Sequence, residues 1–387
     1  MKFPDKLHKK IVDRKENNSY RQLCTGSKGI DFSSNDYLGF SKNKRIAGQV
    51  NTSLNQFENL NGSTGSRLIS GNHVLHEELE SELASFFKSQ SALLFNSGYD
   101  ANLGLLSCLP QHGDVILFDE LCHASIRDGI RLSYAKSYKF KHNDLTDLKK
   151  KFNTTRNQKG NTYVIVESIY SMDGDQAPLM EFVKFCKNNL IYMMVDEAHA
   201  TGVYGNSGNG LIGELGLEDH VFARIHTFGK AMGCHGAVIV GSSELKHFLI
   251  NYARSFIYTT AIPLHNVLTI KYAIKELLVT NEGLKLLNNI TYFRNEIKIK
   301  GLQNLFVQSE SAIQSCIIPH NFKVKDLAQK LRNQNYDIKA ILSPTVPKGK
   351  ERLRFCLHSF NTKKDISNVL CLLKEIISKS SFPLESN

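Results

Sequence analysis

The stretch RIHTFGKAMGCHGAVIVG, residues 224–241, decides the fold and the chemistry of this chain. Its only lysine, Lys230, directly follows Gly229, and Thr227 stands three residues upstream. Because glycine has no Cβ, backbone and ligand can approach such a lysine closely. Most Gly-Lys pairs are surface turns, so this stretch does not identify a binding site without a second motif.

The second motif supplies an acid. The apolar run 190–195 is followed at once by Asp196, within the sequence VDEAHATG of residues 195–202. Such a run predicts a buried strand with Asp196 at its end. Pyridoxal phosphate takes a lysine for a Schiff base and an acid against its pyridinium nitrogen. Asp196, followed downstream by Lys230, therefore predicts a pyridoxal-phosphate site.

The composition is that of a globular enzyme. The chain has 387 residues, 41% hydrophobic and 22% charged, and this length predicts a large domain plus a smaller one. No apolar run is long enough to cross a bilayer, and the lysine-rich segment 1–18 lacks the apolar core of a secretory signal. Eight cysteines without a Cys-x-x-Cys pair indicate reduced thiols. We expect a cytoplasmic protein that binds neither a membrane nor a metal.

The net charge of +11 raises the question of an anionic partner. Basic chains bind nucleic acids, membrane surfaces or anionic substrates. Here the lysines are scattered, the clusters at 149–151 and 348–350 are short, and no nucleic-acid recognition motif is present. We therefore expect a solvated positive surface, with attraction of a phosphate-bearing acyl donor as the second interpretation.

Strands and helices are expected to alternate from residue 91 onward. Parallel strands with helical crossovers form an α/β sheet, which binds ligands at the carboxyl ends of its strands. Strands are predicted at 91–95, 115–118, 163–166, 191–195 and 237–240, and helices at 76–87, 101–109, 125–132, 179–188 and 244–253.

Three regions are expected along the chain. An N-terminal arm and segment, 1–50, precedes a large cofactor-binding domain, 51–275, and a small α+β domain, 276–387. The small domain is predicted to contain strands at 312–318, 336–342 and 353–358, and helices at 324–331 and 364–377.

Polar residues gather at the predicted strand ends. The turn 96–100 leads into a helix whose free amides and macrodipole favour an anion. The stretch 30–40 ends in a turn rich in Asn, Asp and Gly. It is either a plain turn or a functional one, and in the functional interpretation Asn35 and Tyr37 lie near a substrate. The residues that follow strands are Ser97, His123, Ser171, Asp196 and His199, and Lys230 lies in the loop before a strand.

Other motifs are weaker. Asp196-Glu197-Ala198-His199 resembles a helicase box, but neither Gly-Lys pair of the chain is followed by Ser or Thr, so a P-loop is excluded. The glycine-punctuated stretch 62–72 does not have the spacing of a dinucleotide-binding loop, and we interpret it as a substrate-side or subunit-contact loop. Lone histidines are usually core residues, and no third ligand has zinc-site spacing.

Taken together, the motifs resemble the α-oxoamine synthases, pyridoxal-phosphate enzymes of fold type I. The resemblance covers about residues 31 to 358 and implies an α/β large domain with a mostly parallel central sheet and a smaller α+β C-terminal domain. The matching stretches are SNDYLG at 34–39, GSRLISG at 65–71, HAS at 123–125, SMDGD at 171–175, DEAH at 196–199 and TFGK at 227–230.

The resemblance implies roles for individual residues around the cofactor. Lys230 would form the Schiff base and move protons at the substrate Cα, and Asp196 would pair with the pyridinium nitrogen. His123 would stack on the ring, while His199 and Ser171 would reach its phenolic oxygen. The phosphate would be held by Ser97, Gly98, Tyr99 and Thr227, with Thr260 contributed by the neighbouring subunit of a homodimer.

The resemblance also implies the substrates. L-Alanine would condense with a pimeloyl thioester, carried by coenzyme A or an acyl carrier protein, and lose carbon dioxide to give 8-amino-7-oxononanoate. Arg354 would bind the amino-acid carboxylate, although Arg352 on the same strand face stays open. Asn35 and Arg21 would lie at the substrate end. Glycine C-acetyltransferase, 5-aminolevulinate synthase and serine palmitoyltransferase remain alternatives within the family, and an aminotransferase or a nucleic-acid-binding protein outside it.

Overall fold

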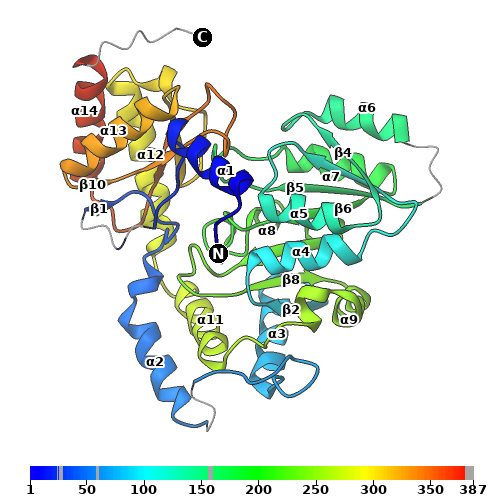
Figure 1. Ribbon diagram of the computed structural model, residues 1–387. Coiled ribbons are helices and arrows are strands. Elements are labelled where there is room, and N and C mark those ends of the chain that lie inside the picture. The colour runs from blue at the N-terminus through cyan, green and yellow to red at the C-terminus, as the bar shows by residue number, and fades with distance from the viewer. Residues whose placement is uncertain (24, 26–28, 58–60, 156–159, 380–387) are drawn as a thin grey trace. The chain divides into compact units, whose positions relative to one another are not determined.

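The computed structural model describes residues 1–23, 25, 29–57, 61–155 and 160–379. The chain forms two compact units (Figure 1). The large unit comprises Asp36–Ser171 and Gln176–Gly283, and the small unit comprises Met1–Asn35, Met172–Asp175 and Leu284–Asn387. Each unit is described by itself below.

A seven-stranded sheet forms the centre of the large unit, in the order β2-β8-β7-β6-β5-β3-β4. Strand β8 is antiparallel to both of its neighbours, and the pairs from β7 to β4 are parallel. The mostly parallel α/β sheet expected from the sequence is therefore confirmed. The strands are β2 (Ser91–Phe95), β3 (Val115–Asp119), β4 (Lys136–Phe140), β5 (Thr162–Glu167), β6 (Tyr192–Asp196), β7 (Ala223–Thr227) and β8 (Ala237–Gly241).

The helices of the large unit cover the sheet and enclose a continuous apolar core (Figure 1). Leu105 of α4, Ile126 of α5 and Ile165 of β5 are completely buried in that core. The helices are α2 (Lys44–Leu54), α3 (Val74–Phe86), α4 (Gly98–Cys108), α5 (Ala124–Leu132), α6 (Leu145–Thr155), α7 (Leu179–Asn188), α8 (Leu211–Glu214), α9 (Ser243–Tyr252), α10 (Arg254–Ile257) and α11 (Leu264–Leu277), with 3-10 turns at Phe40–Lys42 and Glu218–His220.

Two strands of this sheet were not predicted from the sequence. Strand β4 is an edge strand whose first four residues are exposed, so it lacks an apolar run. Strand β7 is buried along its whole length but contains Arg224 and His226. The guanidinium of Arg224 donates to the backbone oxygen of Phe87 at 2.7 Å, and the ring of His226 stacks on that of Phe87. Local tertiary contacts thus stabilise a strand that hydrophobicity does not indicate.

The small unit is an α+β assembly. Strands β11 (Lys339–Ile341), β12 (Arg352–Cys356) and β9 (Ile313–Ile317) form an antiparallel sheet, and β1 (Ile30–Asp31) pairs with β10 (Tyr336–Asp337). The single strand expected at 336–342 is therefore divided in two. The helices are α1 (Asp5–Glu16), α12 (Glu282–Ile299), α13 (Asn321–Asn333) and α14 (Lys363–Lys379), with a 3-10 turn at Gln303–Leu305.

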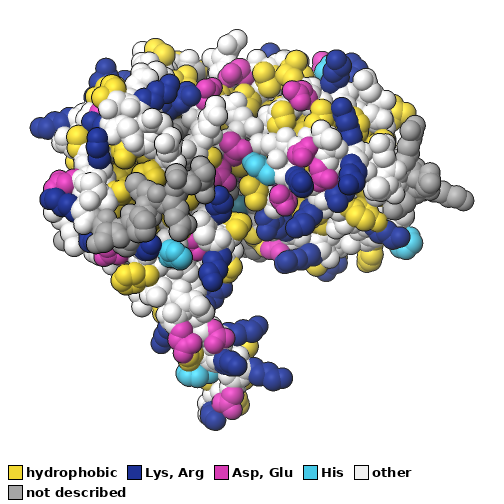
Figure 2. Space-filling view, turned by 90° about the horizontal axis from the view of Figure 1, so that it is seen from above, with side chains coloured by type: hydrophobic (Ala, Val, Ile, Leu, Met, Phe, Trp, Pro, Cys, Tyr) yellow, Lys and Arg dark blue, Asp and Glu magenta, His cyan; other side chains and the backbone are white. Residues whose placement is uncertain are grey.

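The distribution of charge, the character of the helices and the grouping of metal-binding side chains are relevant to possible partners. Lys and Arg side chains are dispersed over the face shown in Figure 2, with acidic side chains among them. Within the described parts of the chain, no helix combines the length and the apolar character needed to cross a membrane. The same residues contain no group of three or more His, Cys, Asp or Glu side chains that could hold a metal ion.

Candidate active site

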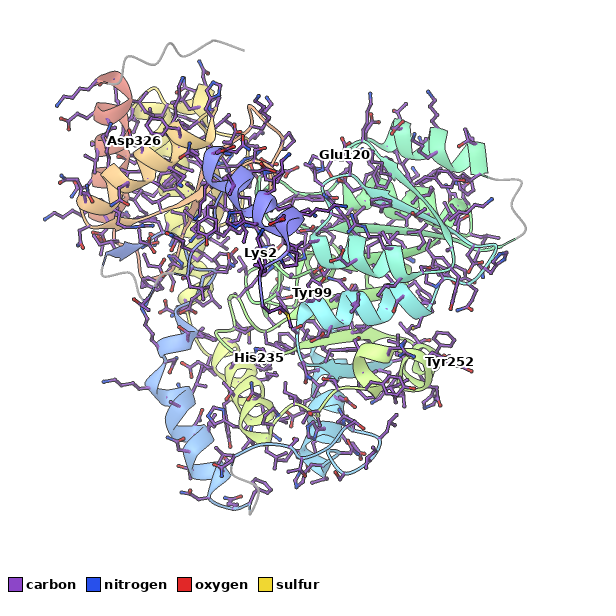
Figure 3. The ribbon with its side chains drawn as sticks, viewed as in Figure 1. Lys2, Tyr99, Glu120, His235, Tyr252 and Asp326 are labelled. Carbon is purple, nitrogen blue, oxygen red and sulfur yellow. The ribbon has the colours of Figure 1, made fainter. Side chains whose placement is uncertain are left out.

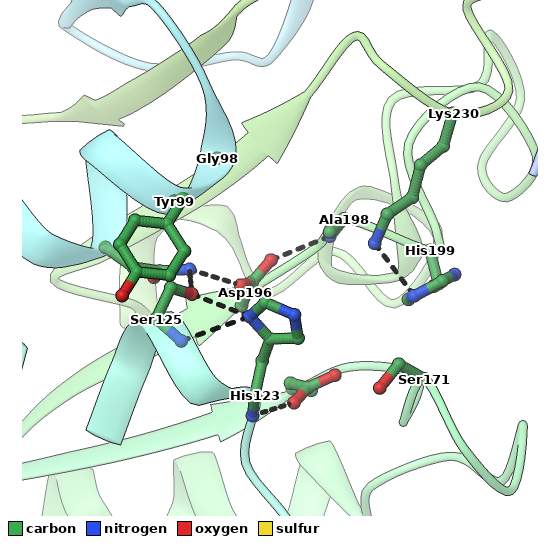
Figure 4. Close-up of a pocket in the computed structure, with 11 residues that line it drawn as sticks. Gly98, Tyr99, His123, Ser125, Ser171, Asp196, Ala198, His199 and Lys230 are labelled. Carbon is green, nitrogen blue, oxygen red and sulfur yellow. Dashed lines mark hydrogen bonds between the residues drawn. The ribbon is translucent and has the colours of Figure 1, made fainter. Parts of the chain in front are cut away.

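One pocket of the large unit lies at the carboxyl ends of the parallel strands (Figure 4). Strand β5 contributes Glu167 and strand β6 contributes Asp196, each as its last residue. This is the edge at which an α/β sheet binds ligands. The lining residues are Gly98, Tyr99, Asn102, His123, Ser125, Glu167, Ser171, Asp196, Ala198, His199 and Lys230.

Asp196 is held as a carboxylate by two donors. Its Oδ1 accepts a hydrogen bond from the backbone N–H of Ala198 at 2.9 Å, and its Oδ2 accepts one from Nδ2 of Asn102 at 2.7 Å. The side chain is almost fully buried. A carboxyl group fixed by these two contacts can face the ring nitrogen of a bound cofactor.

Lys230 lies on the other side of the pocket, close to His199. Its Nζ is 2.8 Å from Nε2 of His199, and Nδ1 of the same ring is 2.8 Å from the phenolic oxygen of Tyr37. Tyr37 is buried. The hydrogen bond from one ring nitrogen fixes the tautomer of the other, so Tyr37 positions His199 toward the amine.

His123 caps the N-terminus of α5 and closes a third side of the pocket. Its Nδ1 lies 2.8 Å from Oγ of Ser125, and its backbone N–H donates to Oε1 of Glu167 at 2.5 Å. Burial lowers the pKa of the His123 ring, and Lys230 acts in the same direction while Asp196 opposes it. A ring that stays neutral is suited to packing against the face of an aromatic cofactor.

The N-terminus of α4 could hold an anion. Ser97 is its N-cap, and the Oγ of Ser97 accepts a hydrogen bond from the backbone N–H of Asp100 at 3.1 Å. Gly98 is next to Thr227, because a Cβ at position 98 would lie 3.4 Å from the Cβ of Thr227. Figure 3 shows Tyr99 on the first turn of this helix. Its backbone amides and positive dipole end favour a phosphate.

Two of the predicted substrate residues contact each other in the small unit. Nη2 of Arg354 donates to Oδ1 of Asn35 at 3.1 Å, and its Nη1 lies 3.1 Å from Sγ of Cys356. Arg21 lies elsewhere in the same unit, where its Nη2 donates to Oγ1 of Thr345 at 3.2 Å.

Arg352 is engaged differently from Arg354. Its Nη1 forms an ion pair with Asp173, and its Nε donates to the backbone oxygen of Lys350 at 2.9 Å. Both arginines belong to β12 and are nearly buried. Arg352 therefore has an internal carboxylate partner within its own unit.

Comparison with known proteins identifies the family. A model of the aminotransferase class I and II family matches residues 27–370. The chain belongs to this family. It is 41% identical to the 8-amino-7-oxononanoate synthase of Emericella nidulans, over 95% of this chain and 94% of that protein. It is 37% identical to the enzyme of the same name from Lysinibacillus sphaericus, over 93% of this chain and 91% of that protein.

Solved structures show the same relationship within the aminotransferase class I and II family. A serine palmitoyltransferase of Sphingomonas wittichii superposes with a TM-score of 0.83 at 29% identity, covering 90% of this chain and 86% of that one. The 8-amino-7-oxononanoate synthase of Francisella tularensis gives a TM-score of 0.77 at 29% identity, covering 90% and 98%. These relatives place the chain among the α-oxoamine synthases, which are pyridoxal-phosphate acyltransferases of fold type I.

The residues present fit the cofactor of this family. Lys230 supplies an amine, Asp196 a carboxylate held by two donors, and α4 a free N-terminus. In addition, Oδ1 of Asn102 is buried without a hydrogen-bond partner in the described part of the chain. A buried amide oxygen without a partner is unusual and consistent with a group that binds there.

Four residues of the pocket were not predicted as site residues from the sequence: Asn102, Ser125, Glu167 and Ala198. Asn102 lies within a helix, so only its contacts with Asp196 and with Ser125 reveal it. Glu167 directly follows the strand predicted at 163–166, and that position could have indicated it. Thr260 does not line the pocket of this chain. Its backbone oxygen accepts a hydrogen bond from Nδ2 of Asn96 at 2.9 Å. Its contribution to a neighbouring subunit's phosphate site stays a prediction.

Proposed function

We propose that this protein condenses L-alanine with a pimeloyl thioester, with loss of carbon dioxide, to give 8-amino-7-oxononanoate. The observation that carries the proposal is the joint placement of Lys230, His199 and Asp196 in one pocket, in a chain 41% identical to a synthase of that name. The same reaction would place the enzyme in biotin biosynthesis.

The chemistry assigns a task to each side of the pocket. When bound, pyridoxal phosphate supplies an electron sink that stabilises negative charge on the alanine Cα. Lys230 would hold the cofactor aldehyde, and its amine would remove the Cα proton of bound alanine. Asp196 would face the ring nitrogen, and the His123 ring would pack against the cofactor and exclude water from that face.

The condensation forms one carbon–carbon bond, breaks the carbon–sulfur bond of the thioester and breaks the bond from Cα to the alanine carboxylate. The deprotonated Cα attacks the thioester carbonyl, forming a carbon–carbon bond, and the carbon–sulfur bond breaks to release the thiol. The alanine carboxylate then leaves as carbon dioxide, and Lys230 returns a proton to Cα. Arg354 would hold the carboxylate until it leaves, since a guanidinium binds a carboxylate with two parallel hydrogen bonds.

The test is an assay of amino acids against acyl donors. Purified protein with pyridoxal phosphate should convert L-alanine and pimeloyl-CoA or a pimeloyl-acyl carrier protein to 8-amino-7-oxononanoate, detected by mass spectrometry. Glycine with acetyl-CoA and serine with palmitoyl-CoA should react at least tenfold more slowly. Preference for either of those pairs would assign the protein to another α-oxoamine synthase reaction.

A homodimer with shared active sites and a cytoplasmic location are parts of the proposal. Leu68 and Ile69, in the loop interpreted as a subunit contact, are 52% and 85% exposed in the single chain, and Tyr258 is 72% exposed. Apolar side chains exposed together are suited to a subunit interface. Seven cysteines of the described residues are free, which suits a reducing compartment. Sedimentation equilibrium would detect the dimer, and a monomer at micromolar concentration would contradict it.

A further inference from the structure

The pocket contains a second acid that the proposed chemistry does not use. Glu167 ends β5 and Asp196 ends β6, and the strand register pairs the two residues directly. Register partners on neighbouring parallel strands lie about 4.8 Å apart and point to the same face of the sheet. Glu167 is 3% exposed, and its side chain lines the pocket together with Asp196.

The two acids are held by different groups. Asp196 accepts hydrogen bonds on both oxygens, from Asn102 and from Ala198. Glu167 accepts a hydrogen bond on Oε1 from the backbone N–H of His123. The ring of the same His123 lines the pocket. Figure 4 shows a dashed hydrogen bond at the backbone nitrogen of His123. Glu167 therefore acts on the position of His123, while Asp196 is fixed by Asn102 and Ala198.

Burial and the neighbouring charges favour the protonated form of Glu167. Burial, followed by the charge of Asp196, raises the pKa of Glu167 to about 8, although Lys230 and the His123 N–H oppose this shift. Asp119 adds to the increase, and Cys122 and Tyr170 interact with Glu167 from the adjoining segments. Two carboxylates in one buried site cannot both ionise at low cost.

We propose that Glu167 is a positioning residue of the cofactor site: its hydrogen bond anchors the His123 backbone beside Asp196, the acid presented to the cofactor. The inference rests on the proposed function only in that the cofactor is pyridoxal phosphate. A protonated Glu167 adds no second negative charge next to Asp196, and its hydrogen bond holds the backbone from which the His123 ring extends into the pocket.

The protonation state can be measured without turnover. Infrared difference spectra of the full-length protein between about pH 6 and about pH 9.5 report protonated carboxyl groups. The cofactor-free protein should lose a band with a midpoint of about 8, besides the Glu197 band with a midpoint of about 7, and Glu167→Gln should lack the band at about 8. Glu197→Gln is the matched control, because burial raises the pKa of Glu197 to about 7 and this residue does not line the pocket. It should lack a different band and keep the one at higher pH.

The positioning role has its own readout, the affinity for pyridoxal phosphate measured by absorbance. Glutamine keeps an oxygen for the His123 N–H, so Glu167→Gln should bind the cofactor within about twofold of wild type at neutral pH. Aspartate is one methylene shorter and loses that contact, so Glu167→Asp should bind about five- to tenfold more weakly.

Each outcome decides the inference. If the carboxyl band persists in Glu167→Gln, or if the wild-type protein lacks it, Glu167 is not protonated at neutral pH and this part of the inference is wrong. If Glu167→Asp binds pyridoxal phosphate with wild-type affinity, the hydrogen bond from His123 to Glu167 does not position the site. If Glu167→Gln does not fold, the band of Glu167→Asp must shift in midpoint, and an unshifted band counts against the inference. Failure of the wild-type protein to bind pyridoxal phosphate would instead refute the proposed function.

Discussion

The amine of Lys230 and the imidazole of His199 are 2.8 Å apart, although 31 residues separate them in the chain. His199 follows β6 and Lys230 follows β7, so the two parallel neighbours bring the residues to the same edge of the sheet. The distance is that of a hydrogen bond between an amine and a ring nitrogen. This contact joins the DEAH and TFGK motifs into one site.

Lys230→Ala should abolish covalent retention of pyridoxal phosphate and turnover together, because this lysine supplies the only amine lining the pocket of the described chain. Borohydride reduction followed by peptide mass spectrometry measures the attachment. Lys184→Ala, at an exposed position on α7, is the control and should label as wild type. Labelling at another lysine in the wild-type protein would show that the assignment is wrong.

Asp196→Asn should keep the fold and lose the charge that holds the ring nitrogen protonated. A hydrogen bond to a charged group contributes about 1.5–3 kcal/mol, so affinity for the cofactor should fall about 10- to 100-fold. Absorbance titration with pyridoxal phosphate measures this change. The exposed residue Asp219 gives the control Asp219→Asn, which should bind as wild type. An unchanged affinity in Asp196→Asn would remove this residue from the cofactor site.

Arg354→Lys should weaken alanine binding by about tenfold or more, because lysine keeps the charge but cannot form two parallel hydrogen bonds to a carboxylate. Arg352→Lys should instead lower stability, since it disturbs the pair with Asp173, and should leave alanine binding nearly unchanged. The change in the cofactor spectrum on addition of alanine measures both variants. The reverse pattern would assign the carboxylate to Arg352.

Glu197 should make the stability of the cofactor-free protein depend on pH. Burial raises the pKa of Glu197 to about 7, above its usual value of 4.5. The folded state therefore holds a proton that the unfolded state releases, and this contribution is complete below about pH 4.5 and is lost as the pH rises through about 7. At about 1.4 kcal/mol per pKa unit, the loss is at most about 3.5 kcal/mol.

Urea unfolding at about pH 5 and about pH 8 checks this prediction. Glu197→Gln should show a smaller decrease in the free energy of unfolding between the two pH values than wild type. Glu181→Gln, at an exposed position, should behave as wild type. Equal decreases in wild type and in Glu197→Gln would show that Glu197 is already ionised in the folded protein.

The amino-acid sequence by itself determined the α/β class and the principal residues of the pocket. Asp196 follows a continuous apolar run, and Lys230 stands next to a glycine, so both could be assigned from local pattern. Such runs report burial, because a central parallel strand is covered on both faces. The domain limits expected at residues 50 and 275 remain predictions.

Only the tertiary structure decided which residues support this chemistry. The pairing of Glu167 with Asp196 depends on the register of β5 and β6, and the contact of Asn102 with Asp196 on the packing of α4. Arg352 and Arg354 are alike in the sequence and differ through Asp173 and Asn35, which belong to distant parts of the chain. Hydrophobic pattern reports which face of an element is buried, whereas polar contacts depend on elements far apart in the sequence.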